Sequence, residues 1–241
     1  MEASKRTVFS VKTVATIAML CAIAFVAKLI STVFPTVSGF LSFDLKDVVI
    51  VIGGFLYGPL AAAIIAGNVS LVEMVTVSTT GAIGLLMNVL ASCSFACIAA
   101  VIYAIRRDMK GAIFGLLLGV LCMTGVMLLW NWLITPLYMK VDRSVVVGML
   151  VPVFLPFNLV KGGINATLAL LLYKPIVTAL RKAHLVPEGN APRQTKWSVL
   201  IASLVLLATF VLFALVLIEN KIYNMNKVSE LVLCLAKSAD A

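Results

Sequence analysis

The chain has 241 residues, of which 62% are hydrophobic and only 12% are charged, and its mean hydropathy is +1.13. Soluble domains carry about 25% charged residues, so this composition excludes an ordinary soluble domain and predicts an all-α, polytopic membrane protein. The net charge of +9 collects in short segments between apolar runs. That pattern is typical of topology signals, and without a nucleic-acid-binding motif it excludes nucleic acid as a partner.

The first apolar run covers residues 14–34 and follows Lys5, Arg6 and Lys12. The positive-inside rule therefore places the N-terminus in the cytoplasm. The run is too long for a signal peptide and no small-residue cleavage site follows it, so we expect it to be retained. The next segment, 35–45, contains proline and glycine but is unusually apolar for a free loop. We expect it to lie outside and to fold back over the protein.

Residues 46–76 contain two glycine-rich breaks, Gly53-Gly54 and Gly58-Pro59. Because proline usually ends a helix just before itself, we expect a short helix over 46–57 and a second helix over 59–76. This division also places the basic turn 106–110 and the basic linker after residue 181 on the cytoplasmic side. A single helix over 46–76 would move both outside and break the positive-inside rule.

Three further runs complete a six-helix core within residues 1–182. They cover 82–105, 112–139 and 149–180. A basic linker, 183–196, then leads to a uniformly apolar run, 197–218, which predicts an additional C-terminal transmembrane helix. The remaining residues, 219–241, form a mixed tail, which this threading leaves on the outer side.

Metal sites and hydrolytic catalytic sites are not expected. Cys93 and Cys97 lie one helical turn apart but lack the second ligand pair of a zinc site, and they are interpreted as small packing residues. His184 is the only histidine and lies in the polar linker, so no Ser-His-Asp or Cys-His set is available. No phosphate-binding loop is present, so energy for any transport must come from a partner or an ion gradient.

A lysine inside the last run of the core is the strongest functional signal. An ammonium group in hydrocarbon costs at least ~2.5–3.5 kcal/mol, so Lys161 is expected to face a cavity or a partner. Asn158 precedes it by three positions and therefore shares its helix face. Asn131 lies near the outer end of the preceding helix, and Asp44 and Asp47 flank the start of the short helix. These residues predict a ligand cavity in the outer half of the membrane.

Aromatic residues near these polar groups favour a planar ligand with polar edges. Trp130 and Tyr138 flank Asn131, and Phe43 and Phe157 flank Asp44 and Asn158. Each residue also has a simpler interpretation. The aromatic residues are equally typical of an interfacial belt, and either asparagine could make an interhelical hydrogen bond.

Two acidic residues give alternatives for the lysine. Lys161 could pair with Asp47 or Glu73 as structural support. Glu73 could instead relay protons, as in proton-coupled carriers, although its place near the outer end of its helix favours a loop-facing or lysine-pairing role. On the first helix, Ala15, Ala18 and Ala22 form a stripe of small residues that would let another helix approach closely.

These residues resemble the substrate-binding S components of energy-coupling-factor (ECF) vitamin transporters, most closely the riboflavin-specific type. The resemblance covers about residues 10–182. It rests on residues 43–47, on Gly53-Gly54 with Gly58-Pro59, on Asn131 with 136–138, and most specifically on 156–162.

The resemblance implies a six-helix S component in the plasma membrane of a prokaryote. It implies that riboflavin, or FMN, is the transported ligand and that there is no cofactor. It also implies a transmembrane T component and two cytoplasmic ATPases as partners, with the S component toppling in the membrane to release its vitamin inside. The expected binding residues are Asn131, Asn158 and Lys161, with Leu41, Phe43 and Asp44 in the covering loop and Trp130 and Tyr138 nearby; Ala18 and Ala22 are expected to dock the T component.

Other functions stay open at this point. The chain could be an S component for another small vitamin, or a solitary proton-coupled carrier that uses Glu73 and Lys161. A membrane enzyme or assembly factor is disfavoured by the missing catalytic set. The segment after residue 182 has no counterpart in the six-helix plan, which leaves the stoichiometry open.

Overall fold

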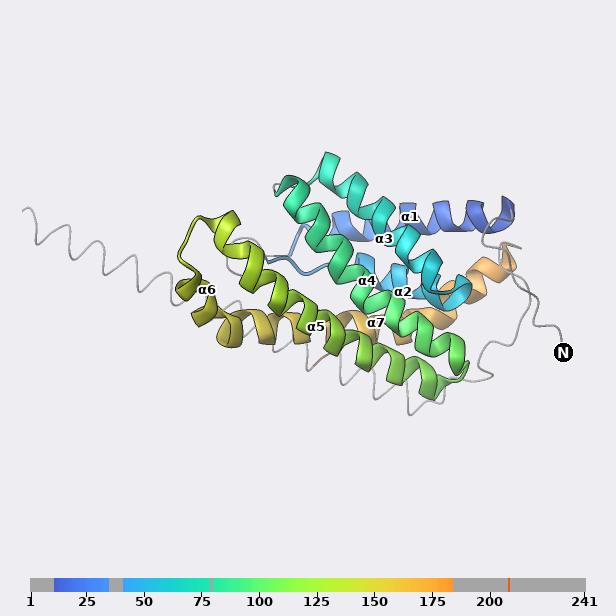
Figure 1. Cartoon of the computed structure of the whole chain (residues 1–241). Coiled ribbons are helices and arrows are strands. Elements are labelled where there is room, and N and C mark those ends of the chain that lie inside the picture. The colour runs from blue at the N-terminus through green and yellow to red at the C-terminus, as the bar shows by residue number, and fades with distance from the viewer. Residues whose placement is uncertain (1–10, 35–40, 79, 184–207, 209–241) are drawn as a thin grey trace, which may run out of the picture.

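The structure of the chain is a computed structural model that describes residues 11–34, 41–78, 80–183 and 208 (Figure 1). All regular elements in this part of the chain are helices, which confirms the predicted class. Apart from residues 183 and 208, the predicted linker, seventh helix and tail lie outside the described residues. The helices are α1 (Val11–Ser31), α2 (Lys46–Tyr57), α3 (Pro59–Thr76), α4 (Gly81–Ile105), α5 (Met109–Met139), α6 (Arg143–Met149) and α7 (Leu155–Lys182), with a π-helical turn, η1 (Leu150–Phe154), between α6 and α7.

The predicted break between α2 and α3 is confirmed at Gly58. This residue has φ +94° and ψ 176°, a conformation that L side chains rarely adopt. Its amide donates to the Gly54 carbonyl and closes α2. Pro59, which has no N–H to lose, then begins α3. The glycine-proline pair therefore separates the two helices at the residues expected from the sequence.

The short helix α2 lies at the centre of the bundle. Its 12 residues rise only ~18 Å, and all residues from Lys46 to Gly54 are buried. It contacts α1, α3, α4 and α7. Because the residues from Lys46 to Gly54 are enclosed by these helices, α2 carries charged residues into the interior.

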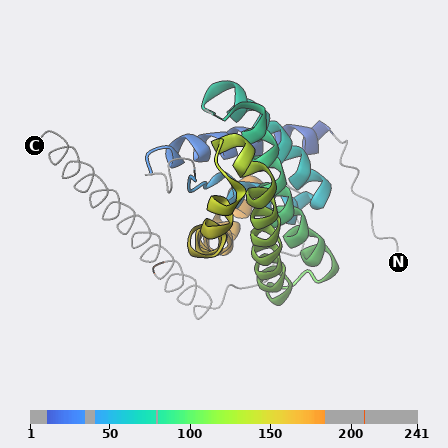
Figure 2. The same ribbon diagram turned by 60° about the vertical axis from the view of Figure 1, so that its left-hand side comes forward.

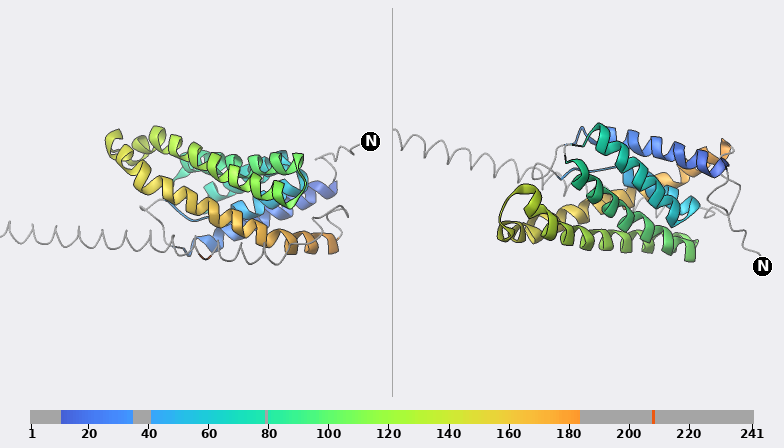
Figure 3. Two further views of the ribbon diagram at one scale, coloured as in Figure 1. Left: turned by 90° about the horizontal axis from the view of Figure 1, so that it is seen from below. Right: turned by 45° about the horizontal axis from the view of Figure 1, so that its top comes forward.

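The helices α4 and α5 form a close antiparallel pair. Gly119 on α5 faces the Phe95 carbonyl oxygen of α4, and a Cβ built on this glycine would lie only 2.6 Å from that oxygen. The absence of a side chain thus sets how closely the two backbones approach. α5 also runs beside α7 (Figure 3), so its position fixes where the residues of α7 lie.

The close approach at Gly119 gives a first testable prediction. Gly119→Ala should lower the thermal unfolding midpoint of the detergent-solubilised protein, because overpacking a tight contact typically costs about 1–3 kcal/mol. Gly125→Ala on the same helix is the matched control, since a Cβ there meets nothing within 4 Å and alanine favours the helix by ~0.5–1 kcal/mol. Equal midpoints for the two variants would contradict this account of the α4–α5 contact.

The start of the last core helix differs from the prediction. One continuous helix was expected from residue 149, but the chain forms α6, then η1 and only then α7. Pro152 and Pro156 have no amide hydrogen, so the regular hydrogen-bond ladder cannot continue through them and the turn widens. Figure 2 brings this end forward and shows α6 at the junction between α5 and α7.

Within the described residues, five helical stretches are long and apolar enough to cross a membrane. They are α1, α3, α4, α5 and the stretch Arg143–Lys182. Large apolar side chains such as Phe114, Leu117 and Leu121 are exposed on their outer faces, as expected for contact with lipid. The chain is therefore a multi-pass membrane protein.

Candidate functional site

Five charged side chains lie together in the interior, a group that we call the buried charge group. Asp44, in the segment 41–45 before α2, is at its centre. Its Oδ1 lies 2.7 Å from Nζ of Lys28 on α1, and its Oδ2 lies 3.2 Å from Nζ of Lys161 on α7. The members are Lys28, Asp44, Lys46, Glu73 and Lys161, all of them buried.

Glu73 completes the buried charge group from α3. Its Oε1 lies 3.0 Å from Nζ of Lys28, and its Oε2 accepts a hydrogen bond from Lys46 on α2. The ion pairs therefore form a continuous chain from Lys46 through Glu73, Lys28 and Asp44 to Lys161. Glu73 does pair with lysines, one of the two roles preferred from the sequence, but with Lys28 and Lys46 and not with Lys161.

The predicted partner of Lys161 was wrong. Asp47 and Glu73 were considered from the sequence, whereas the lysine pairs with Asp44. Asp47 follows Lys46 on α2 and is rotated by about 100° from it around the helix axis. Its Oδ1 accepts a hydrogen bond from Ser92 on α4, and its Oδ2 has no hydrogen-bond partner among the described residues.

The buried charge group contains three ammonium groups and two carboxylates. Burial alone would raise the pKa of Asp44, but Lys46, Lys161 and Lys28 hold its pKa well below the ordinary value. Asp44 thus stays ionised at neutral pH. Desolvation offsets much of the Coulomb attraction in such a group, but removing a single partner leaves an uncompensated buried charge and typically costs about 3–5 kcal/mol.

An apolar cover lies beside Lys161. Leu41 packs with Val146, Phe154 and Phe157 in a buried cluster, and Phe43 lies at its edge. The Phe43 and Phe157 rings are 5.0 Å apart between centroids. The described part of the predicted covering segment, residues 41–45, therefore does fold over the start of α7; residues 35–40 lie outside the described residues.

The two predicted amides are buried and bonded within their own helices. Asn131 donates to the Met127 carbonyl at 2.7 Å and accepts from the Thr135 hydroxyl at 2.8 Å. Asn158 donates to the Phe154 carbonyl at 2.8 Å. Each amide nitrogen carries a second hydrogen for a further acceptor. Asn158 and Lys161 share the buried face of α7, as the sequence predicted.

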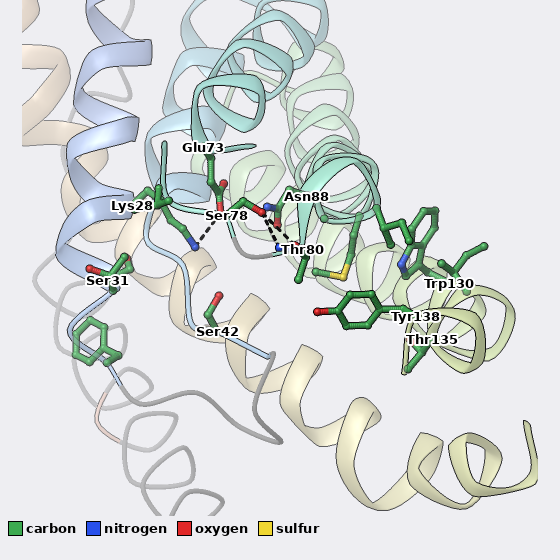
Figure 4. Close-up of a pocket in the computed structure, with 17 residues that line it drawn as sticks. Lys28, Ser31, Ser42, Glu73, Ser78, Thr80, Asn88, Trp130, Thr135 and Tyr138 are labelled. Atoms are coloured by element: carbon green, nitrogen blue, oxygen red, sulfur yellow. Dashed lines mark hydrogen bonds and ion pairs between the residues drawn. The ribbon is translucent and has the colours of Figure 1, made fainter. Parts of the chain in front are cut away.

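A cavity of about 210 Å³ opens between α1, the α3–α4 connection and α5 (Figure 4). Trp130 and Tyr138 line it, together with Lys28 and Glu73 of the buried charge group. The other predicted binding residues do not line this cavity; they are Leu41, Phe43, Asp44, Asn131, Asn158 and Lys161.

Bonded residues connect the cavity wall with two of the predicted binding residues, Asn131 and Lys161. Lys28 lines the cavity and is joined to Lys161 through Asp44. Thr135 also lines the cavity and bonds to Asn131. The cavity wall is thus linked to Asn131 by a hydrogen bond and to Lys161 by two ion pairs through Asp44.

The buried lysines of α1 and α2, Lys28 and Lys46, were not predicted as site residues from the sequence. Lys28 is a charged residue inside an otherwise apolar run, the same signal that identified Lys161. Lys46 is the first residue of α2 and precedes Asp47, and a charged residue at the end of a helix is too common to indicate a site. The cavity residues Ser78, Thr80 and Asn88 carry no comparable signal, because small polar residues are typical of any turn between two membrane helices.

The alanine stripe of α1 lies on the surface. Ala15, Ala18 and Ala22 are exposed, while the opposite face of the helix, including Leu20 and Ala24, is buried. The stripe is therefore available to another protein in the membrane.

Comparison with known proteins identifies the family of the chain. The model of the family "ECF transporter, substrate-specific component" matches residues 12–173. The chain is 31% identical over 177 residues to riboflavin transporter RibU of Staphylococcus aureus, covering 71% of this chain and 93% of that protein. It is 29% identical over 187 residues to riboflavin transporter FmnP of Bacillus subtilis, covering 73% and 98%.

A solved structure of the S component of a bacterial ECF transporter has the same fold. It is 32% identical in sequence and superposes with a TM-score of 0.59, covering 70% of this chain and 96% of the solved one. The matched regions include α1 to α5, η1 and the buried face of α7 that carries Asn158 and Lys161. The chain therefore belongs to the family of substrate-specific components of ECF transporters.

Proposed function

We propose that this chain is the high-affinity riboflavin-binding subunit of an ECF-type importer in the plasma membrane of a prokaryote. The observation that carries the proposal is the face of α7 on which Asn158 and Lys161 lie buried, with the apolar cover folded over the start of the helix. The names of the two relatives, both riboflavin transporters, support the same ligand.

The chemistry of this face suits an isoalloxazine ring. The ring is a flat apolar surface with carbonyl and N–H groups along one edge. Lys161 supplies donors only, whereas Asn131 and Asn158 each supply a donor and an acceptor. Phe43 and Phe157 supply aromatic surface next to them. The ring would bind with its polar edge toward the lysine and amides, and FMN is a related ligand of the same face.

Binding requires a local exchange of partners. Lys161 is paired with Asp44, so a ligand carbonyl must take a hydrogen of the ammonium group that does not point at Asp44, or replace the carboxylate. Asp44 retains Lys28 and Lys46 as partners in either case. Movement of the 41–45 segment would then open and close the site toward the outer side.

Uptake in this proposal needs partners. The sequence contains no phosphate-binding loop, so two cytoplasmic ATPases and a transmembrane T component would supply the energy. The exposed face with Ala18 and Ala22 would dock the T component. The N-terminus would be cytoplasmic, as the basic residues before α1 indicate.

The test is a titration of the purified protein in detergent with riboflavin, thiamine and biotin, followed by tryptophan fluorescence. Trp130 lines the cavity (Figure 4) and should be quenched by a nearby flavin. We expect saturable quenching at nanomolar riboflavin and none with the other two vitamins. Saturable binding of another vitamin, with no response to riboflavin, would replace the proposed ligand.

A further inference from the structure

The segment 41–45 is tied to α1 by a backbone hydrogen bond as well as by the ion pair of Asp44. The Leu45 amide donates to the Ser31 hydroxyl at 2.9 Å, and this hydroxyl donates in turn to the Ala27 carbonyl at 2.7 Å. Ser31 is only 1% exposed, so water does not easily replace its hydroxyl as the acceptor for the Leu45 amide. One buried hydroxyl therefore joins the end of α1 to the segment before α2.

Lys28 and Ser31 attach two successive residues of this segment to the same helix. They lie three positions apart and share the buried face of α1. Lys28 holds Asp44 through its side chain, and Ser31 holds Leu45 through its backbone amide. Leu45 directly precedes the first turn of α2, so the two attachments fix the segment at its junction with the helix bundle.

The two attachments differ in what else depends on them. Lys28 also pairs with Glu73 on α3, so its loss would disturb the balance of the whole buried charge group. The Ser31 hydroxyl carries no charge, and the bond that it accepts comes from the segment alone. Replacing Ser31 by alanine therefore weakens the hold on the segment and leaves every buried charge in place.

The same segment carries the apolar cover at its other end. Leu41 is buried with Phe154 and Phe157, and the Phe43 ring lies 5.0 Å from that of Phe157. The helices α1 and α2 pack against each other in the bundle, so Ser31 keeps its place when the cover moves. Lifting the segment from α7 as a unit would therefore break the bond between Leu45 and Ser31.

We propose that Ser31 is a positioning residue that keeps the segment 41–45 closed and so sets how fast the ligand enters and leaves. The assignment rests on the proposed function, in which this segment opens and closes the site. The bond from Leu45 to Ser31 exists in the closed conformation, with the ligand outside or bound, and is broken in the open one. Its loss destabilises the closed conformation equally in both cases, so it speeds entry and release alike and leaves the affinity unchanged.

The experiment measures the rates of riboflavin binding and release with the full-length protein in detergent. Association is followed by stopped-flow tryptophan quenching, and dissociation by the flavin released from immobilised protein under ligand-free buffer. Ser31→Ala should raise both rate constants about 3- to 10-fold, the equivalent of one ordinary hydrogen bond, with an unchanged dissociation constant. Ser31→Thr keeps the hydroxyl and should retain the wild-type rates, while Ser31→Cys, with a weaker acceptor, should give intermediate rates.

The matched control is Thr167→Val on α7. It removes a buried hydroxyl that bonds to the Gly163 carbonyl of its own helix at 2.7 Å, and it should change neither rate. Thermal unfolding midpoints of all variants show that the rates are compared between folded proteins.

The outcomes separate control of the segment from contact with the ligand. Unchanged rates in Ser31→Ala would overturn the positioning role while riboflavin binding stands. A weaker affinity with an unchanged association rate would make Ser31 a ligand contact instead, since it also lines the cavity. Equal acceleration in Ser31→Ala and Thr167→Val would show a general loosening of the bundle and would also overturn the assignment. If the wild-type protein binds no flavin, the proposed function and this assignment fall together.

Discussion

Replacing Lys161 by methionine is expected to weaken riboflavin binding about ten- to a hundredfold while the protein stays folded. A hydrogen bond to a charged group contributes about 1.5–3 kcal/mol, and ~1.4 kcal/mol corresponds to a tenfold change in affinity. Folding should survive because Lys28, Lys46, Asp44 and Glu73 remain, with equal numbers of positive and negative groups. Methionine also fills most of the volume of the lysine stem.

The matched control is Lys174→Met, on an exposed position of the same helix. Both variants would be titrated with riboflavin by tryptophan quenching, and their thermal unfolding midpoints would be compared with that of the wild-type protein. Unchanged affinity in Lys161→Met would remove this lysine from the ligand site. Loss of binding together with loss of the folded state would show that its role is structural.

The positions of the helices could largely be predicted because they follow from local chemistry. Gly58-Pro59 ends one helix and begins the next by a backbone conformation and a missing N–H, and neither depends on distant residues. The turn η1 could not be predicted in the same way. Pro152 and Pro156 indicate that the helical hydrogen-bond ladder is interrupted. Whether the helix then kinks, ends or forms a wider turn depends on how Phe154 packs against Leu41.

The residues of the site were predicted from the sequence better than the ion pairs between them. Lys161 and Asp44 were both identified, because a charged residue beside or within an apolar run is costly and therefore informative. Their contact was missed because Asp44 lies in a non-helical segment, where no periodicity indicates which way a side chain points. From the sequence, Asp47 and Glu73 were considered as partners instead, but the helical register of α2 turns Asp47 toward Ser92.

Replacing Glu73 by glutamine should destabilise the protein strongly. The wild-type buried charge group has three ammonium groups against two carboxylates, an excess of one; the variant has three against one. Leaving a buried charge without its partner typically costs about 3–5 kcal/mol. The measurement is the thermal unfolding midpoint in detergent, with Asp142→Asn, at an exposed carboxylate, as the control that should leave it unchanged.

A double variant distinguishes charge balance from proton transfer. Lys46→Met with Glu73→Gln leaves two ammonium groups against one carboxylate and so restores the wild-type excess of one. Because Lys46 pairs with Glu73, the effects of the two changes should be strongly non-additive, and the double variant should be more stable than Glu73→Gln alone. A solitary proton-coupled carrier that uses Glu73 predicts the reverse: Glu73→Gln would keep its stability, lose uptake and gain nothing from Lys46→Met. Both carboxylate oxygens of Glu73 pair with lysines, so we expect the double variant to be more stable than Glu73→Gln alone.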